Sequence, residues 1–233
     1  MDIVVGYLPL IMKGTMITIL VSVCSILLSV VFGLLGAWGK LSASKAANRA
    51  AGAYTTLIRG VPDLVLMLLL FYGGQQLLND LGDATGLWGY VEINHFTAGV
   101  GTIGFIFGAY MTETFRGAYL AIPSGEVEAG VACGMSRAVL LVRIIWPQLV
   151  RYALPSFSNN WLVLLKTTAL VSVLGLHELV YQTMAAGRST RQLFLFIFVA
   201  LSLYLALTAF SNSGLRWLDR KYSVGIRRGI DHG

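Results

Sequence analysis

The sequence predicts an all-α polytopic membrane protein with five transmembrane helices, an outside N-terminus and a cytoplasmic C-terminus. Of its 233 residues, 56% are hydrophobic and only 12% are charged, which is about half the charged fraction of an ordinary globular domain. Five stretches are long enough, or nearly so, to cross a hydrocarbon core that needs roughly 20 apolar residues. Lys and Arg are concentrated after every second stretch, which indicates the orientation of the chain.

The five expected spans follow one another with short connections except before the fourth. The first, 14–38, has no charged residue, and its length and the acidic residue ahead of it argue against a cleaved signal peptide. The second, 54–78, centres on the run LVLMLLLFYGGQQLL. The third, 96–116, is rich in glycine, which lets helices approach closely in lipid. The fourth, 152–176, is interrupted by polar residues, and the fifth, 192–215, is again uncharged.

The positions of Lys and Arg predict which ends of the spans face the cytoplasm. The loop between the second and third spans, 79–95, holds three acidic residues and no Lys or Arg, whereas the segments after spans one, three and five are basic. Cytoplasmic segments carry the excess of Lys and Arg, so the net charge of +6 needs no nucleic acid to explain it. We expect one transmembrane domain, 13–215, followed by a basic cytoplasmic tail, 216–233, that can contact anionic lipid headgroups.

A polar segment, 123–147, separates the third and fourth spans. Ser124 can cap a first short helix, whose opening turns carry two glutamates that suit the helix dipole. Gly134 can adopt the left-handed conformation that ends a helix. Ser136 then offers a second cap, and an amphipathic helix continues until Pro147. The segment predicts a helix, a glycine joint and a second helix on the cytoplasmic face; an interfacial helix with no further role is the alternative.

The residue identities and spacing of this segment resemble the EAA motif of ABC importer permeases. The matching positions are Glu128, Ala129, Gly134, Ile144 and Pro147. Gly130 and Trp146 depart from the motif, since alanine and leucine are usual at these two positions. In that family the motif forms the coupling helix, which docks into a groove on the ATP-hydrolysing subunit. The resemblance therefore implies a mechanical role for these residues.

The resemblance extends over nearly the whole chain. The stretch GAYMTETFRGAYLAIPSGEVEAG, 108–130, resembles the signature of polar amino acid permeases, and TTLIRGVPDLVLMLLLFYG and SNNWLVLLKTTALVSVLGLHEL match two further blocks of that family. The likeness is greatest to Q-type permease subunits of histidine and lysine/arginine/ornithine importers, with arginine and opine (octopine, nopaline) permeases nearly as close. It implies a type I ABC importer transmembrane fold in the bacterial inner membrane. It also implies transport of amino acids, in particular basic amino acids.

The resemblance also implies partner proteins. The P-loop pattern is absent, because Leu34 stands where its first glycine belongs ahead of Gly39-Lys40. ATP and Mg²⁺ are therefore expected on two copies of a separate ABC ATPase subunit, with no catalytic residue, cofactor or metal on this chain. A second permease subunit, identical or related, would bring the number of spans to ten. An extracytoplasmic solute-binding protein would deliver the amino acid.

Polar and ionisable residues in or near the expected spans are candidates for the translocation path or for pairing within the membrane. A charge at the bilayer centre costs about 2.5–3.5 kcal/mol, so each one calls for a reason. The candidates are Arg59, Asp63, Glu113, Arg116, Asn159, Asn160, Trp161 and Lys166. Arg59 and Asp63 are spaced for a local ion pair. Glu113 either favours a cation in the path or pairs with Arg116, three residues later, and both readings stay open.

Two other classes of protein fit the sequence less well. A secondary transporter often shows inverted repeats, and no convincing repeat is visible. An intramembrane hydrolase would need nucleophile and base or metal-ligand patterns, and neither H-E-x-x-H nor G-x-S-x-G occurs. Either class would leave the spacing from Glu128 to Pro147 unexplained.

Overall fold

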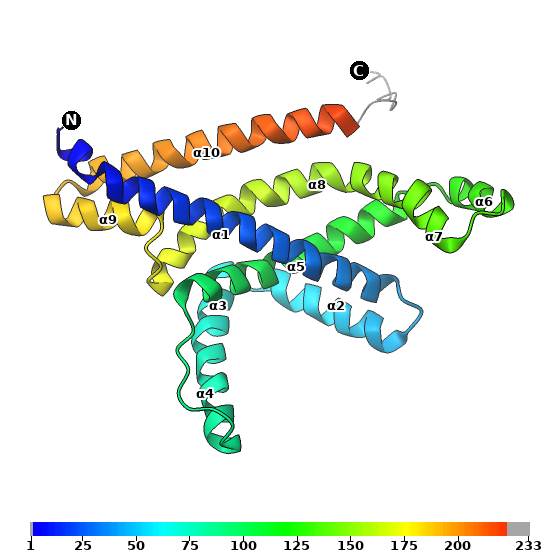
Figure 1. The fold of residues 1–233 in the computed structure, drawn as a ribbon, viewed down its shortest axis with the longest axis horizontal. Coiled ribbons are helices and arrows are strands. Elements are labelled where there is room, and N and C mark those ends of the chain that lie inside the picture. The colour runs from blue at the N-terminus through cyan, green and yellow to red at the C-terminus, as the bar shows by residue number, and fades with distance from the viewer. Residues whose placement is uncertain (1, 223–233) are drawn as a thin grey trace.

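The computed structural model describes residues 2–222, and over these residues the chain forms only helices and their connections. The α-helices are α1 (Asp2–Leu41), α2 (Lys45–Gly60), α3 (Asp63–Leu68), α4 (Gly74–Thr85), α5 (His95–Leu120), α6 (Ser124–Ala132), α7 (Arg137–Leu140), α8 (Trp146–Thr167), α9 (Leu179–Thr190) and α10 (Leu193–Tyr222). π-Helical segments join α3 to α4 and α7 to α8, and a 3-10 segment, Thr168–Leu174, follows α8. The long helices run roughly side by side, α4 projects from the body, and α6 and α7 lie at one end (Figure 1).

The packing of α1 against α5 forms the centre of the molecule. Phe107, Ile103 and Met111 on α5 are almost completely buried. Glycines allow the two backbones to approach, because a Cβ added at Gly108 would lie 2.5 Å from the Cβ of Phe32. Buried hydroxyls on α1 donate to carbonyls of their own helix, which satisfies polar groups that lipid could not hydrogen-bond.

A buried acid joins three helices near the start of α9, and the sequence did not single it out. Glu178 is only 1% exposed. Its carboxylate accepts hydrogen bonds from the backbone N–H of Tyr181 at 2.8 Å and from the hydroxyls of Thr18 and Tyr204, both at 3.3 Å. The acid caps α9 and ties it to α1 and α10.

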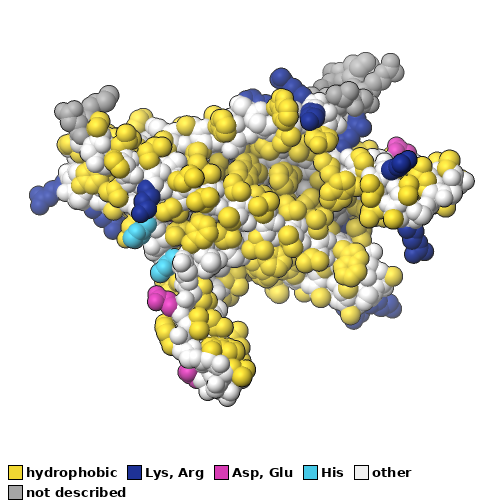
Figure 2. All heavy atoms as spheres, in the orientation of Figure 1, with side chains coloured by type: hydrophobic (Ala, Val, Ile, Leu, Met, Phe, Trp, Pro, Cys, Tyr) yellow, Lys and Arg dark blue, Asp and Glu magenta, His cyan; other side chains and the backbone are white. Residues whose placement is uncertain are grey.

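Four helical segments among the described residues are long and apolar enough to cross a membrane. They are Ile3–Leu41, Asp63–Thr85, Arg137–Leu174 and Leu193–Tyr222. The third expected span coincides with α5, in which 13 of the 26 residues are buried. The glycines and hydroxyl-bearing residues of α5 lower its mean hydropathy. Such residues are typical of a membrane helix that packs against other helices more than against lipid. Figure 2 shows hydrophobic side chains over the middle of the molecule and Lys and Arg gathered mainly toward its ends, as expected for a multi-pass membrane protein.

The second expected span, 54–78, is not one continuous helix. Its first residues belong to α2, which ends at Gly60, and a new helix begins at Asp63 after Pro62. Proline disfavours helical geometry in the residue before it, and Val61 is extended with φ −116° and ψ 143°. The candidate span therefore begins at the proline and not at residue 54.

Pro147 does not end the helix that precedes it, contrary to the prediction. The chain stays helical from α7 through a π-helical segment, Leu141–Ile145, into α8, where Pro147 lies in the first turn. A proline is tolerated where its missing N–H is not needed, and a wider π turn relieves the crowding upstream of the ring. The fourth expected span thus continues directly from the polar segment. Residues 216–222 of the expected tail extend α10, and its remainder, 223–233, lies outside the described residues.

Candidate functional site

The polar segment forms two short helices that meet at a glycine, at the end of the molecule far from the N-terminus (Figure 1). Ser124 is the first residue of α6 and not its cap: Pro123 occupies the cap position, and no side chain caps this helix. Ser136 caps α7 as predicted, since its Oγ accepts a hydrogen bond from the N–H of Val139 at 3.4 Å. The order of helix, joint and helix is therefore present.

The joint depends on a left-handed glycine. Gly134 has φ +76°, and the N–H of Met135 reaches back to the carbonyl of Gly130 at 3.1 Å, which closes the last turn of α6. A left-handed conformation costs roughly 1–2 kcal/mol for a residue with a side chain.

For the transport role that the resemblance implies, we expect Gly134→Ala to lower ATP-dependent uptake several-fold, because the joint would hold α7 at a different angle to α6. Uptake and ATP hydrolysis by reconstituted complex would measure it. Gly125→Ala is the matched control, since an added Cβ at Gly125 meets nothing within 4 Å. Equal activities of the two variants would contradict the prediction.

The matching motif positions divide into exposed and packed residues. Glu128 and Ala129 are exposed on α6, whereas Gly130 is buried. Glu126 is held within the chain by Gln148, whose Nε2 donates to Oε2 at 2.6 Å. The side chain of Glu128 forms no hydrogen bond or ion pair with any residue between 2 and 222, so this exposed carboxylate is free to contact another subunit.

The inner face of the segment explains one departure from the motif. A Cβ added at Gly130 would lie 2.6 Å from Cδ1 of Leu140 and 2.7 Å from Cδ1 of Ile144. These two side chains fill the space that the alanine of the usual motif would occupy, and they pack α6 against the second helix. Ile144 therefore holds the segment together, while Pro147 is exposed at the start of α8.

A polar cavity of about 490 Å³ lies among α2, α5 and α8. It brings together four of the residues that the sequence nominated. Its lining is Arg59, Tyr110, Glu113, Thr114, Pro155, Ser156, Asn159 and Asn160. Asn160 is oriented by its Nδ2, which donates to Oγ1 of Thr114 at 3.0 Å. Cationic, anionic and amide groups thus line one cavity.

Arg59 and Asp63 do not form the ion pair that their spacing allows. The break at Pro62 removes the regular helical turn between them, so a separation of four residues no longer places them on one face. The guanidinium of Arg59 lies instead over the ring of Tyr110, with its Cζ 5.4 Å from the ring centroid. This cation–π contact leaves the donors of Arg59 available to an anionic group in the cavity.

Glu113 contacts two cations at once. Arg116 Nε donates to Oε2 at 3.0 Å, and Lys40 Nζ donates to Oε1. Both contacts are ion pairs between side chains of described residues. Lys40 was missed because no sequence spacing links the last turn of α1 to a residue 73 positions later.

Four nominated residues lie outside the cavity lining. Asp63 is partly buried at the start of α3, Arg116 lies beyond Glu113 on α5, and Trp161 packs against the central core. Lys166 is exposed in the last turn of α8.

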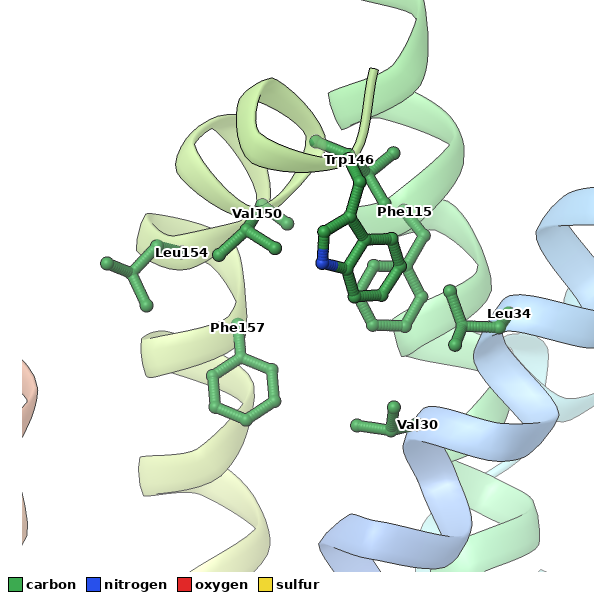
Figure 3. Close-up of a pocket in the computed structure, with 9 residues that line it drawn as sticks. Val30, Leu34, Phe115, Trp146, Val150, Leu154 and Phe157 are labelled. Carbon is green, nitrogen blue, oxygen red and sulfur yellow. The ribbon is translucent and has the colours of Figure 1, made fainter. Parts of the chain in front are cut away.

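A second recess, of about 220 Å³, lies between α1, α5 and α8 (Figure 3). Phe157 and Leu154 of α8 border it on one side and Val30 and Leu34 of α1 on the other, with Trp146 beside Phe115 at one end. This lining has no charged group for an amino acid's ammonium or carboxylate. The polar cavity is therefore the candidate path.

An all-helical membrane chain with an exposed two-helix segment at one end and a polar cavity between its helices has the architecture of a transporter's membrane subunit. The family model of the binding-protein-dependent transport system inner membrane component matches residues 29–224, and the chain belongs to this family. Its members work with a separate ATPase subunit and a solute-binding protein.

Relatives of known function cover almost the full length. The histidine/lysine/arginine/ornithine transport system permease protein HisQ of Escherichia coli K12 is 49% identical over 96% of this chain and 97% of its own length. The octopine transport system permease protein OccQ of Rhizobium radiobacter is 40% identical, over 94% and 92%.

Solved structures agree with the fold. A crystal structure of an amino acid ABC transporter with histidines superposes with a TM-score of 0.79 at 29% identity, covering 94% of this chain and 96% of the other. An inward-facing structure of the methionine ABC transporter MetNI gives a TM-score of 0.70 at 16% identity, covering 92% and 97%, which supports the fold alone.

Proposed function

We propose that this chain is a permease subunit of an ATP-driven, binding-protein-dependent importer of basic amino acids: histidine, lysine, arginine and ornithine. The observation that carries the proposal is 49% identity, over 96% of the chain, to a permease named for these four substrates. Opines are the alternative substrates, supported by the 40% identity to an octopine permease.

The polar cavity supplies groups suited to a basic amino acid. The guanidinium of Arg59 matches the substrate's carboxylate, with which it can form two parallel hydrogen bonds. Asn159, Asn160 and Glu113 provide carbonyl and carboxylate oxygens for ammonium groups. A charged solute that has lost its water needs such partners at membrane depth, so we assign these four residues to the translocation path.

The subunit crosses the membrane five times in this proposal, with its N-terminus outside. α5 adds the third span to the four apolar segments, and the basic residues near α2, α6 and α10 lie in the cytoplasm. Two permease subunits, identical or related, enclose the path with ten spans, and two ATPase copies bind beneath them.

The transport cycle uses the coupling segment, residues 123–147, as a lever. The loaded binding protein docks outside, and ATP with Mg²⁺ draws the two ATPases together. Their motion reaches the spans through the exposed face of α6, where Glu128 and Ala129 lie, and through the continuous helix from α7 into α8. The cavity then opens inward, and the amino acid leaves.

The test is reconstitution of this chain with its co-purifying subunits in liposomes that contain ATP. We expect ATP-dependent uptake of labelled arginine, lysine, ornithine and histidine when binding protein is added outside. Uptake of octopine alone would overturn the substrate assignment. Uptake that persists without ATP would instead favour a secondary transporter.

A further inference from the structure

The carboxylate of Glu113 in the polar cavity has no free oxygen. Oε1 accepts from the ammonium of Lys40 and Oε2 from the guanidinium of Arg116. The side chains of Lys40 and Glu113 are 17% and 21% exposed, and that of Arg116 is 39% exposed. The group therefore lies where charge–charge interactions are screened less than at an open surface.

This arrangement does not attract cations as it stands. One carboxylate faces two cations, and Arg59 adds a third positive charge to the lining of the same cavity. An arriving ammonium would gain little from Glu113, because like charges close to the acid oppose it. A cationic substrate would interact strongly with this acid once one of the two resident cations withdraws.

Lys40 is the cation that can withdraw. Arg116 stands one turn from Glu113 on the same helix, so the backbone of α5 keeps the two together. Lys40 comes from the last turn of another helix and reaches Glu113 with a compact ammonium on a flexible stem. Its backbone is held separately, since Nδ2 of Asn48 donates to the Lys40 carbonyl at 2.6 Å. The side chain can therefore leave while the end of α1 stays in place.

We propose that Lys40 is a specificity-determining residue whose ammonium occupies Glu113 in the resting state and gives up that place to a cationic substrate. The inference rests on the proposed function and deepens it. Exchange of one cation for another keeps the charge around Glu113 constant. The substrate is therefore not bound too tightly to leave again. A neutral amino acid such as citrulline has an α-ammonium group but no side-chain cation to exchange, and Lys40 then stays on Glu113.

The first test compares Lys40→Gln with Lys45→Gln, which removes the same charge from an exposed position at the start of α2. Binding of labelled arginine is measured on the purified complex in nanodiscs. Binding protein is left out, so that it does not determine the measured affinity. We expect Lys40→Gln to tighten arginine binding about fivefold, the effect of a partly exposed ion pair, and to slow its turnover. Citrulline, the neutral isostere of arginine, should show no such shift.

Equal affinities for arginine in the two variants, or the same shift for citrulline, would overturn the inference. Lys40→Arg keeps a cation and should behave more like the wild type. These results are separable from the proposed function: a wild-type complex that imports no basic amino acid refutes that function, whereas normal import with indistinguishable Lys40 and Lys45 variants refutes only the exchange.

The second test uses the unaltered complex, so it does not depend on a variant that folds. A lysine bound to a carboxylate reacts slowly with amine-acylating reagents. When the carboxylate releases it, its amine becomes accessible and reacts faster. Arginine should raise the rate at which Lys40 is acylated, measured by peptide mass spectrometry, while citrulline should not and Lys45 should not respond. An unchanged rate at Lys40 with saturating arginine would exclude the exchange.

Discussion

Glu128→Ala is expected to lower ATP-dependent uptake at least about tenfold while the membrane complex still assembles. Glu128 is exposed on α6, and its side chain makes no hydrogen bond or ion pair with any residue between 2 and 222. The substitution therefore removes nothing from the packing of this chain, and its effect falls on the contact with the ATPase. We expect Glu128 to be a hot spot of this contact, and truncating a hot-spot side chain costs about 2 kcal/mol or more, which exceeds a tenfold change.

The measurement pairs uptake with ATP hydrolysis in proteoliposomes and with co-purification of the ATPase. Glu126→Gln is the matched control, because it removes the same charge two residues earlier on the same helix. The amide oxygen of the new side chain can still accept the hydrogen bond from Gln148 that Glu126 accepts at 2.6 Å. Full uptake by Glu128→Ala at normal protein levels would refute the role of the coupling segment.

Features with a local cause could be predicted from the sequence. Long apolar runs predict the helices that form α1 and α10, because burial in lipid depends on composition and length. The left-handed joint at Gly134 and the cap by Ser136 were also predictable, since each depends on residues within one turn. Four residues that line the polar cavity could be nominated from the sequence, because charges and amides are costly in lipid wherever the chain folds.

Features that depend on distant parts of the chain could not be predicted. Pro62 and Pro147 look alike as helix breakers, yet the first ends a helix and the second lies inside a continuous one. A π-helical segment ahead of Pro147 makes the difference, and no local pattern specifies it. For Glu113 the sequence offered Arg116 on the same helix as one possible partner, whereas Lys40 of α1 also binds it. Only the close packing of α1 on α5 creates that second contact.

That packing leads to the strongest prediction about stability: Gly33→Ala should weaken the folded subunit by about 1–3 kcal/mol, the usual cost of overpacking. An added Cβ at Gly33 would lie 2.4 Å from the Cβ of Met111 and 3.0 Å from its carbonyl carbon. Neither atom is the end of a flexible side chain, so α1 and α5 must separate.

Thermal unfolding of the detergent-solubilised subunit would measure the loss, and we expect a midpoint lower by roughly 3 °C or more. Gly117→Ala on α5 is the control, because a Cβ there meets nothing within 4 Å and alanine favours a helix over glycine. Separation of α1 from α5 would also pull Lys40 away from Glu113, so Gly33→Ala should disturb arginine recognition together with stability. If Gly33→Ala were as stable as Gly117→Ala, this would mean that α1 and α5 are not packed as closely as the absence of a side chain at Gly33 permits.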